Sequence, residues 1–167
     1  MDELARETID VIAISRVQAA YADVVTRRAW PELHDLFRPD APVEVDTVTA
    51  APIELTGPDG IGSFISGAIE RFEFFEFVIL NSHIVTGVDG DTDAARARLY
   101  MCELRQESAT EETPAGQWSN AFGIYHDDYV RHDGRWWFAR RRYQSLARIE
   151  LSGRAEVFPF PHHPGFA

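Results

Sequence analysis

The amino-acid sequence predicts an α+β domain in which helices come first and an antiparallel sheet follows. Apolar residues recur at helical spacing over residues 3–28. From Phe74 onward the chain is rich in β-branched and aromatic residues, and the pairs Asp89-Gly90 and Asp133-Gly134 mark tight turns. No helical pattern interrupts this second part, so consecutive strands are expected to pair antiparallel. We therefore expect three N-terminal helices packed on an antiparallel sheet.

The helical part opens with an amphipathic helix at residues 3–28. Its apolar positions include Leu4, Ile9 and Ile12, with charged residues between them. The elements expected after it are a short helix at 31–37 that begins with Pro31, strands at 41–48 and 51–55, a turn at 56–60 and a third helix at 61–72.

Four strands and their turns account for most of the remaining chain. They are expected at residues 74–86, 94–107, 117–131 and 135–149, with a long polar loop at 108–116. A chain of 167 residues is long enough for one core, and no linker or repeat divides it. We expect one domain at residues 1–152, followed by a Pro- and aromatic-rich tail at 153–167 that cannot be regular from Phe158 to Pro164.

Charge and composition exclude several classes of function. A net charge of −11 disfavours binding to nucleic acid or to an anionic membrane surface. All 16 basic residues are arginine, which excludes a lysine Schiff base. The single cysteine, Cys102, excludes an internal disulfide and a multi-cysteine zinc site. The sequence shows neither a signal-peptide core nor an apolar run of membrane-spanning length, so we expect a cytoplasmic protein.

Three stretches carry a more specific signal. They are Tyr21-Ala22-Asp23 with Trp30 to Phe37, Asn81 to Asp91, and Gly123 to Tyr129 with Asp133 to Phe138. In composition and order they resemble the SnoaL-like branch of the nuclear-transport-factor-2-like superfamily, which includes polyketide cyclases, ketosteroid isomerases and scytalone dehydratases. The resemblance implies a cone, in which a strongly curved antiparallel sheet wraps around the helices and leaves an internal cavity. This fold hosts isomerases, dehydratases and pure binding modules, so the reaction stays open.

The chain departs from the scytalone-dehydratase-like pattern. Those relatives carry an acidic residue on the first helix, where this chain has Thr26 and Ala29. They also carry a histidine before the hairpin asparagine, where this chain has Phe77. A histidine–aspartate dyad of that type is therefore not expected.

The ketosteroid-isomerase-like pattern implies Tyr21, Asp46 and His126 as catalytic residues. In that role Asp46 would move a proton, while Tyr21 and His126 would hydrogen-bond the oxygen that gains charge. Each has a structural alternative. Tyr21 would be a packed aromatic residue, and His126 a core histidine that its register with Ile124 places on the concave face. Asp46, like Glu44, would be a solvent-facing carboxylate unless a bulge turns it inward.

Substrate contacts are expected from His83, Tyr125 and Arg141. Strand alternation does not decide the face of His83. Arg141 would clamp an anionic substrate, or else pair with surface carboxylates. The histidines and carboxylates show no metal-ligand spacing, so neither a metal nor another cofactor is expected.

The expected function is cofactor-free acid–base chemistry, of the isomerase or dehydratase type, on a hydrophobic cyclic or polyketide-like molecule. The alternative is a non-catalytic ligand-binding module or a partner subunit similar to dioxygenase small subunits. Trp136 and Phe138 should face the core beneath the first helix. Tyr125, Tyr129 and Trp137 are expected on the outer face of the sheet, where they would favour a homodimer.

Overall fold

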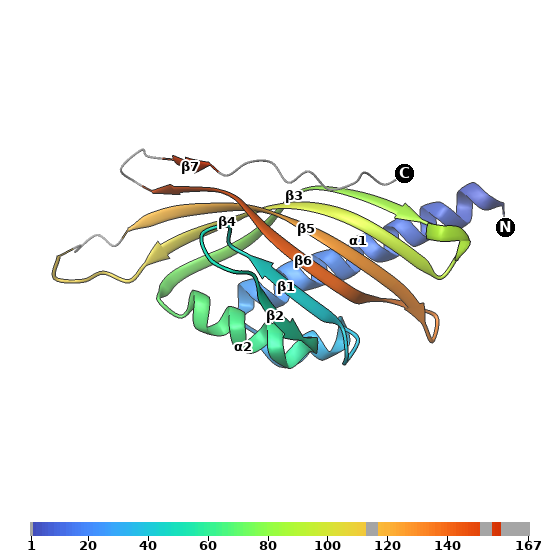
Figure 1. The fold of residues 1–167 in the computed structure, drawn as a ribbon, viewed down its shortest axis with the longest axis horizontal. Coiled ribbons are helices and arrows are strands. Elements are labelled where there is room, and N and C mark those ends of the chain that lie inside the picture. The colour runs from blue at the N-terminus through green and yellow to red at the C-terminus, as the bar shows by residue number, and fades with distance from the viewer. Residues whose placement is uncertain (1, 113–116, 151–154, 158–167) are drawn as a thin grey trace.

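The fold is α+β, as predicted, with helices packed on one face of a curved sheet (Figure 1). A computed structural model describes residues 2–112, 117–150 and 155–157. The elements in chain order are α1 (Glu3–Arg27), the 3-10 helix η1 (Trp30–Asp35), β1 (Pro42–Asp46), β2 (Ile53–Thr56), α2 (Gly57–Ile69), β3 (Phe72–Thr86), the 3-10 helix η2 (Val88–Gly90), β4 (Ala94–Glu107), β5 (Trp118–His132), β6 (Arg135–Glu150) and β7 (Ala155–Val157).

Helix α1 starts and stops where its end residues satisfy the backbone. The Asp2 side chain accepts a hydrogen bond from the backbone N–H of Ala5 at 2.7 Å, and Arg28 ends the helix in the left-handed conformation. The buried face contains Asp10, Ile14, Gln18, Tyr21, Val24 and Val25. Leu4, Ile9 and Ile12, expected on the apolar face, are instead exposed, because Asp10 and Ile14 set the side that meets the sheet.

Helix α2 begins earlier than predicted. Gly57 and Pro58, expected in a turn, are its first two residues. Gly57 has a φ of 66° and donates its N–H to the carbonyl of Ala41 at 2.8 Å. A Cβ at this position would lie 2.3 Å from the carbonyl oxygen of Pro39, so only glycine fits. The helix ends at Ile69, and Phe72, expected to be helical, starts β3 instead.

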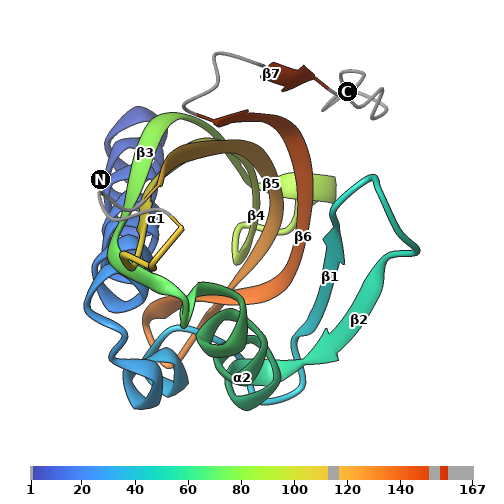
Figure 2. The ribbon, with the colours of Figure 1, turned by 90° about the vertical axis from the view of Figure 1, so that its left-hand side faces the viewer.

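The sheet has the strand order β2-β1-β6-β5-β4-β3, and β7 also pairs with β6. Strands β3 to β6 form the predicted antiparallel meander, whereas β1 pairs parallel with β6. Irregularities in pairing occur next to Asn81, Gly123 and Tyr129, and such bulges increase the local bend of a sheet. Seen end-on, the sheet curls around one side of the molecule, with α1 and α2 along the open side (Figure 2).

The core lies between α1 and the concave face of the sheet. Trp136 is 4% exposed and Phe138 is fully buried, which confirms their predicted position. The indole N–H of Trp136 donates to Asp10 at 3.2 Å, and Arg131 pairs with the same carboxylate at 2.6 Å. The buried acidic residue of α1 is thus neutralised by the sheet on which it packs.

The outer face carries fewer aromatic residues than predicted. Tyr125 and Tyr129 are buried on the inner face, so their predicted placement is wrong. Trp137 is partly exposed, and the guanidinium of Arg135 lies 3.7 Å from its ring centroid. The homodimer stays a prediction that now depends on Trp137 alone.

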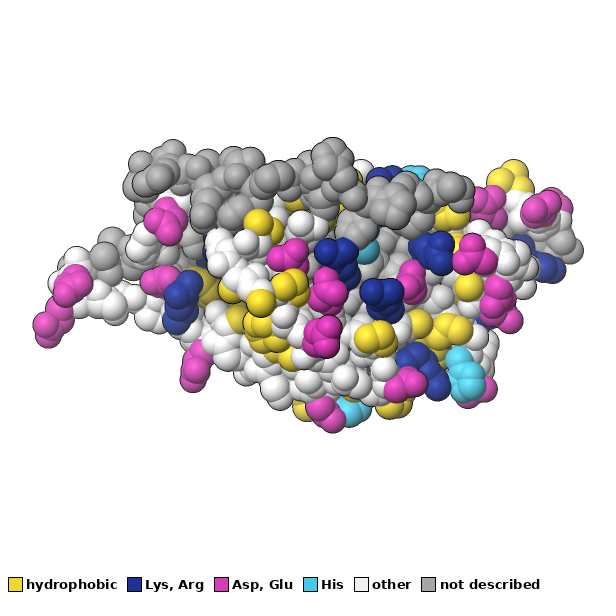
Figure 3. Space-filling view, viewed as in Figure 1, with side chains coloured by type: hydrophobic (Ala, Val, Ile, Leu, Met, Phe, Trp, Pro, Cys, Tyr) yellow, Lys and Arg dark blue, Asp and Glu magenta, His cyan; other side chains and the backbone are white. Residues whose placement is uncertain are grey.

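The molecular surface shown in Figure 3 is mixed in charge. Acidic and basic side chains are interspersed over this face rather than gathered by sign. Neither α-helix in the described part of the chain is long and apolar enough to cross a membrane. The predicted irregular segment Phe158–Pro164 lies outside the described residues.

Candidate functional site

A pocket of about 830 Å³ lies between the concave face of the sheet and the two α-helices. Its apolar wall comes from β1 and α2, whose lining side chains include Val43, Val45, Ile61, Phe64, Ile65 and Ile69. Aromatic side chains from α1 and the sheet line it as well, namely Tyr21, Phe72, Phe77, Tyr125 and Tyr143. This volume and apolar lining are typical of a site for a small molecule.

One buried ion pair lies beside this pocket. The guanidinium of Arg141 (β6) and the carboxylate of Asp127 (β5) are both fully buried, and two hydrogen bonds of 2.8 Å join them. The hydroxyl of Tyr129 also donates to Asp127, at 3.0 Å, and Gln18 on α1 donates to that hydroxyl at 3.1 Å. The carboxylate is therefore held from two strands and, through Tyr129, from the first helix.

Aromatic rings surround the guanidinium of Arg141. Its carbon atom Cζ lies 4.0 Å from the ring centroid of Tyr21, 4.1 Å from that of Tyr125 and 4.2 Å from that of Phe138. The faces of aromatic rings attract a cation, most strongly where water is excluded. Burial lowers the pKa of Arg141, but Asp127 more than offsets this effect and the net pKa is raised. The side chain is a permanent cation.

Asp127 does not use every nitrogen atom of this cation. Arg141 uses Nε and Nη2 on Asp127, while its buried Nη1 makes no hydrogen bond of normal geometry with the described residues. Its guanidinium does lie close enough to the hydroxyl of Tyr21 to lower the pKa of that hydroxyl. The buried hydroxyl oxygen of Tyr21 likewise makes no hydrogen bond of normal geometry within the described chain. Both residues line the pocket. Buried donors without partners are rare and costly, and a bound molecule is one way to satisfy them.

Burial also fixes the protonation of the pocket tyrosines. It raises the pKa of Tyr21, an effect that the charge of Arg141 partly offsets. Burial raises the pKa of Tyr125 well above its usual value and that of Tyr143 to about 12. All three hydroxyls are therefore protonated at neutral pH and can donate hydrogen bonds.

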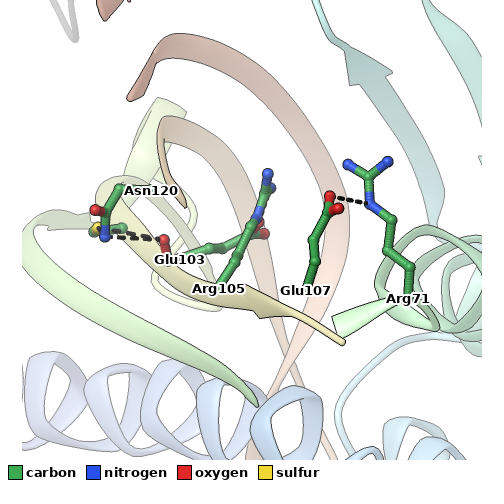
Figure 4. Close-up of polar contacts among 6 residues, drawn as sticks. Arg71, Glu103, Arg105, Glu107 and Asn120 are labelled. Atoms are coloured by element: carbon green, nitrogen blue, oxygen red, sulfur yellow. Dashed lines mark hydrogen bonds and ion pairs between the residues drawn. The ribbon is translucent and has the colours of Figure 1, made fainter. Parts of the chain in front are cut away.

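A charged rim lines the pocket near the C-terminal end of β4. Glu103, Arg105 and Glu107 alternate along this strand, and Arg71 faces Glu107 (Figure 4). Arg105 Nε lies 2.8 Å from a carboxylate oxygen of Glu103, which Nη2 also contacts, and Arg71 Nε lies 3.2 Å from Glu107. We call Arg71, Glu103, Arg105 and Glu107 the rim. Its two acidic and two basic groups neutralise one another.

Three of the six residues predicted for the site line the pocket. They are Tyr21, Tyr125 and Arg141. His83 is exposed on β3 and is not a lining residue.

The predicted convergence of Asp46 and His126 on the pocket is wrong. On β1, Val43, Val45 and Thr47 line the pocket, so the intervening Asp46 points to the other face, where it accepts a hydrogen bond from the N–H of Val48 at 2.8 Å. No bulge turns it inward.

His126 alternates with Tyr125 and Asp127, which face inward. It therefore faces outward, between Arg98 on β4 and Arg142 on β6. The apolar neighbour Ile124 suggested the opposite face. A charged residue can face inward here because Arg141 compensates the charge of Asp127.

The two positions compared with the dyad of scytalone-dehydratase-like proteins contact each other in this structure. Thr26 takes the place of the acidic residue and Phe77 that of the histidine. The backbone N–H of Phe77 donates a hydrogen bond to the hydroxyl of Thr26 at 3.0 Å. This bond joins α1 to β3, and the ring of Phe77 lines the pocket. No histidine is among the pocket-lining residues, and no group of His, Cys, Asp and Glu side chains in the described chain could hold a metal ion.

A curved sheet closed by helices over a pocket defines the class of nuclear-transport-factor-2-like cone proteins. A family model described as a SnoaL-like domain matches residues 6–142. The chain belongs to this SnoaL-like family. A search of curated proteins gave no match.

Solved structures of the same fold agree with this assignment. A hexachlorocyclohexane dehydrochlorinase, LinA-type3 from Novosphingobium barchaimii LL02, is 19% identical over 95% of this chain and 100% of its own, with a TM-score of 0.72. A protein from Novosphingobium aromaticivorans DSM 12444 that is provisionally named a scytalone dehydratase is 22% identical over 94% of this chain and 97% of its own, with a TM-score of 0.71. At these identities the likeness shows the fold alone.

Proposed function

We propose that this protein binds one small, largely apolar molecule in its pocket and holds a polar oxygen of that molecule on Arg141. The observation that carries the proposal is the buried Nη1 of Arg141, which makes no hydrogen bond of normal geometry in the described chain and belongs to a residue that lines the pocket. Leaving a buried donor unsatisfied costs about 1–3 kcal/mol, and a ligand oxygen at this point removes that cost. The apolar wall supplies the remaining affinity.

Acid–base catalysis on the bound molecule is the second candidate, of the isomerase or dehydratase type. It is favoured by Glu103, whose carboxylate belongs to a residue that lines the same pocket as Arg141 and Tyr21. Oxygen-holding donors together with a carboxylate base are the groups that proton transfer next to a carbonyl requires. The dehydrochlorinase and the provisional dehydratase among the relatives are named for eliminations, which also begin or end with a proton transfer.

Binding is tested with 2-tetralone, a bicyclic ketone with one carbonyl oxygen. Its dissociation constant is measured by isothermal titration calorimetry for the wild type and for the double variant Asp127→Asn/Arg141→Met, which removes the cation without leaving a buried unpaired carboxylate. We expect affinity to fall about 10- to 100-fold, as for a lost hydrogen bond to a charged group.

The matched control is Arg142→Met, the same substitution one residue along β6. Arg142 faces outward and pairs with Glu44 at 2.7 Å. This variant should bind 2-tetralone as the wild type does. A folded double variant with unchanged affinity would show that Arg141 does not hold the ligand.

A further inference from the structure

We infer that Glu103 is the proton-transferring residue of this pocket, and that it acts on the carbon next to the carbonyl group of an enolisable cyclic ketone. This inference rests on the proposed function, because the carbonyl oxygen must first be held by Arg141. It assigns a catalytic role to a residue of the rim, on a strand that contains none of the residues predicted for the site.

Glu103 lies deeper than the other carboxylates of the pocket. Within the described chain, Glu103, Glu107 and Glu150 are the acidic residues that line it. Glu107 and Glu150 are the last residues of β4 and β6, whereas Glu103 lies four residues further inside β4. Its side chain is only 15% exposed, against 39% for Glu107. A carboxylate in such a position meets the ligand rather than bulk water.

Glu103 faces the groups that we propose hold the carbonyl oxygen of the ligand. Its strand neighbours across the sheet are Phe77 on β3 and Ala121 on β5, so it faces the same space as Tyr125. The charge of Glu103 raises the pKa of Tyr21 and Tyr125, after the larger effects of burial, of Arg141 and of each tyrosine on the other. It therefore lies within electrostatic reach of both hydroxyls.

Apart from Glu107 and Glu150 at the strand ends, no other lining group in the described chain is a suitable proton acceptor. Histidine is absent from the lining residues, the tyrosines are protonated and the arginines are cations. Arg105, on the same strand, donates a hydrogen bond to the carboxylate of Glu103 and thereby orients it. Arg105 is a positioning residue in this scheme.

The proposed step balances without a co-reactant. The C–H bond next to the carbonyl breaks, its proton goes to a carboxylate oxygen of Glu103, and its electron pair forms the C=C bond of an enolate. The carbonyl oxygen takes up the negative charge while Nη1 of Arg141 and the hydroxyl of Tyr21 donate to it. When the proton on Glu103 is replaced from solvent, reprotonation of the same carbon gives exchange, whereas protonation of a conjugated carbon gives isomerisation.

Exchange can be measured without knowing the natural substrate. The wild-type protein is incubated with 2-tetralone in D₂O, and loss of the proton signal next to the carbonyl is followed by NMR. We expect exchange above the buffer rate that saturates with 2-tetralone. Glu103→Gln should slow it by about 100-fold or more, as expected for loss of a general base, while the dissociation constant of 2-tetralone changes less than threefold. Glu76→Gln, an exposed position on β3 outside the pocket, is the matched control and should leave the rate unchanged.

A shortened base separates catalysis from folding. Glu103→Asp keeps the charge, and we expect it to exchange more slowly than the wild type but faster than Glu103→Gln. Binding of 2-tetralone without exchange above buffer, or full exchange by Glu103→Gln, would overturn this inference alone. Failure of the wild type to bind 2-tetralone would overturn the proposed function, and this inference with it.

Discussion

Removing the charge of Asp127 tests whether the buried ion pair is built as described. The Asp127→Asn variant keeps the shape of the side chain but leaves the guanidinium of Arg141 without its counter-charge. Both side chains are fully buried, and two hydrogen bonds of 2.8 Å join them. Full burial keeps the cation away from solvent, and three aromatic rings offer only a partial substitute for the lost carboxylate.

The expected loss is large for a single isosteric change. Breaking a buried pair by removing one partner costs about 3–5 kcal/mol, and the retained amide oxygen places this variant near 3 kcal/mol. For a chain of this size that loss lowers the melting temperature by roughly 6–12 °C. Urea unfolding followed by tryptophan fluorescence and far-ultraviolet circular dichroism measures the free energy of unfolding.

The double variant Asp127→Asn/Arg141→Met supplies the decisive comparison. Methionine fits among the rings that surround Arg141 and needs no counter-charge, so most of the lost stability should return. A loss below about 1 kcal/mol for Asp127→Asn, or a double variant less stable than the single one, would refute the description of a desolvated and mutually dependent pair.

Three further predictions follow from the same structure. Burial raises the pKa of four tyrosines above the unfolded-state value near 10, so stability is full below about pH 10 and falls as pH rises further, by up to about 1.4 kcal/mol per pH unit for each tyrosine. These residues are Tyr21, Tyr125, Tyr129 and Tyr143, the last with a pKa of about 12. Tyrosinate absorbance and circular dichroism should therefore change together in alkali, and tyrosine ionisation in a folded chain would contradict this. Gly57→Ala should lose about 2 kcal/mol or more in urea unfolding because of its positive φ and the 2.3 Å approach to Pro39. Asp46→Asn and His126→Ala should each bind 2-tetralone within about twofold of the wild type, since neither lines the pocket, and a tenfold loss would count against that placement.

Sequence patterns predicted the order and kind of most elements. Strand β4 matches its predicted bounds, and the other long strands begin and end within two residues of theirs, because Asp-Gly turns and β-rich runs are local signals. The start of α2 was missed for a physical reason. Gly57-Pro58-Asp59-Gly60 has the composition of a turn, but the backbone bond from Gly57 to Ala41 makes it the first turn of a helix. That contact is not local in sequence.

The site was harder to predict because both faces of β5 carry apolar residues. Ile124 and His126 face outward, while Tyr125, Asp127 and Tyr129 face inward. Only the partner strand explains this choice, since Arg141 makes a buried aspartate tolerable. A usable signal did exist, because the alternation of Asp127 with two tyrosines is unusual for a solvent-facing stretch.

On β4, Glu103, Arg105 and Glu107 lie on the same face as Leu99 and Met101, which are buried. This continuation of a buried face into charged residues marks a pocket rim, and the sequence-based prediction did not use it.

The geometry of Arg141 also distinguishes between two kinds of ligand oxygen. A carboxylate binds a guanidinium best through two parallel hydrogen bonds, but Asp127 already occupies Nε and Nη2 and only Nη1 remains. The net charge of −11 adds a long-range repulsion of anions that weakens as salt shortens the screening length from about 30 Å at 0.01 M to about 10 Å at 0.1 M. A neutral carbonyl oxygen needs one donor and is not repelled. We therefore expect 2-tetralone to bind more tightly than 2-naphthoate, a carboxylate with the same two-ring body, and to bind equally well at both salt concentrations. Tighter binding of 2-naphthoate at low salt would show that the pocket is built for an anion and that the Asp127–Arg141 pair opens to receive it.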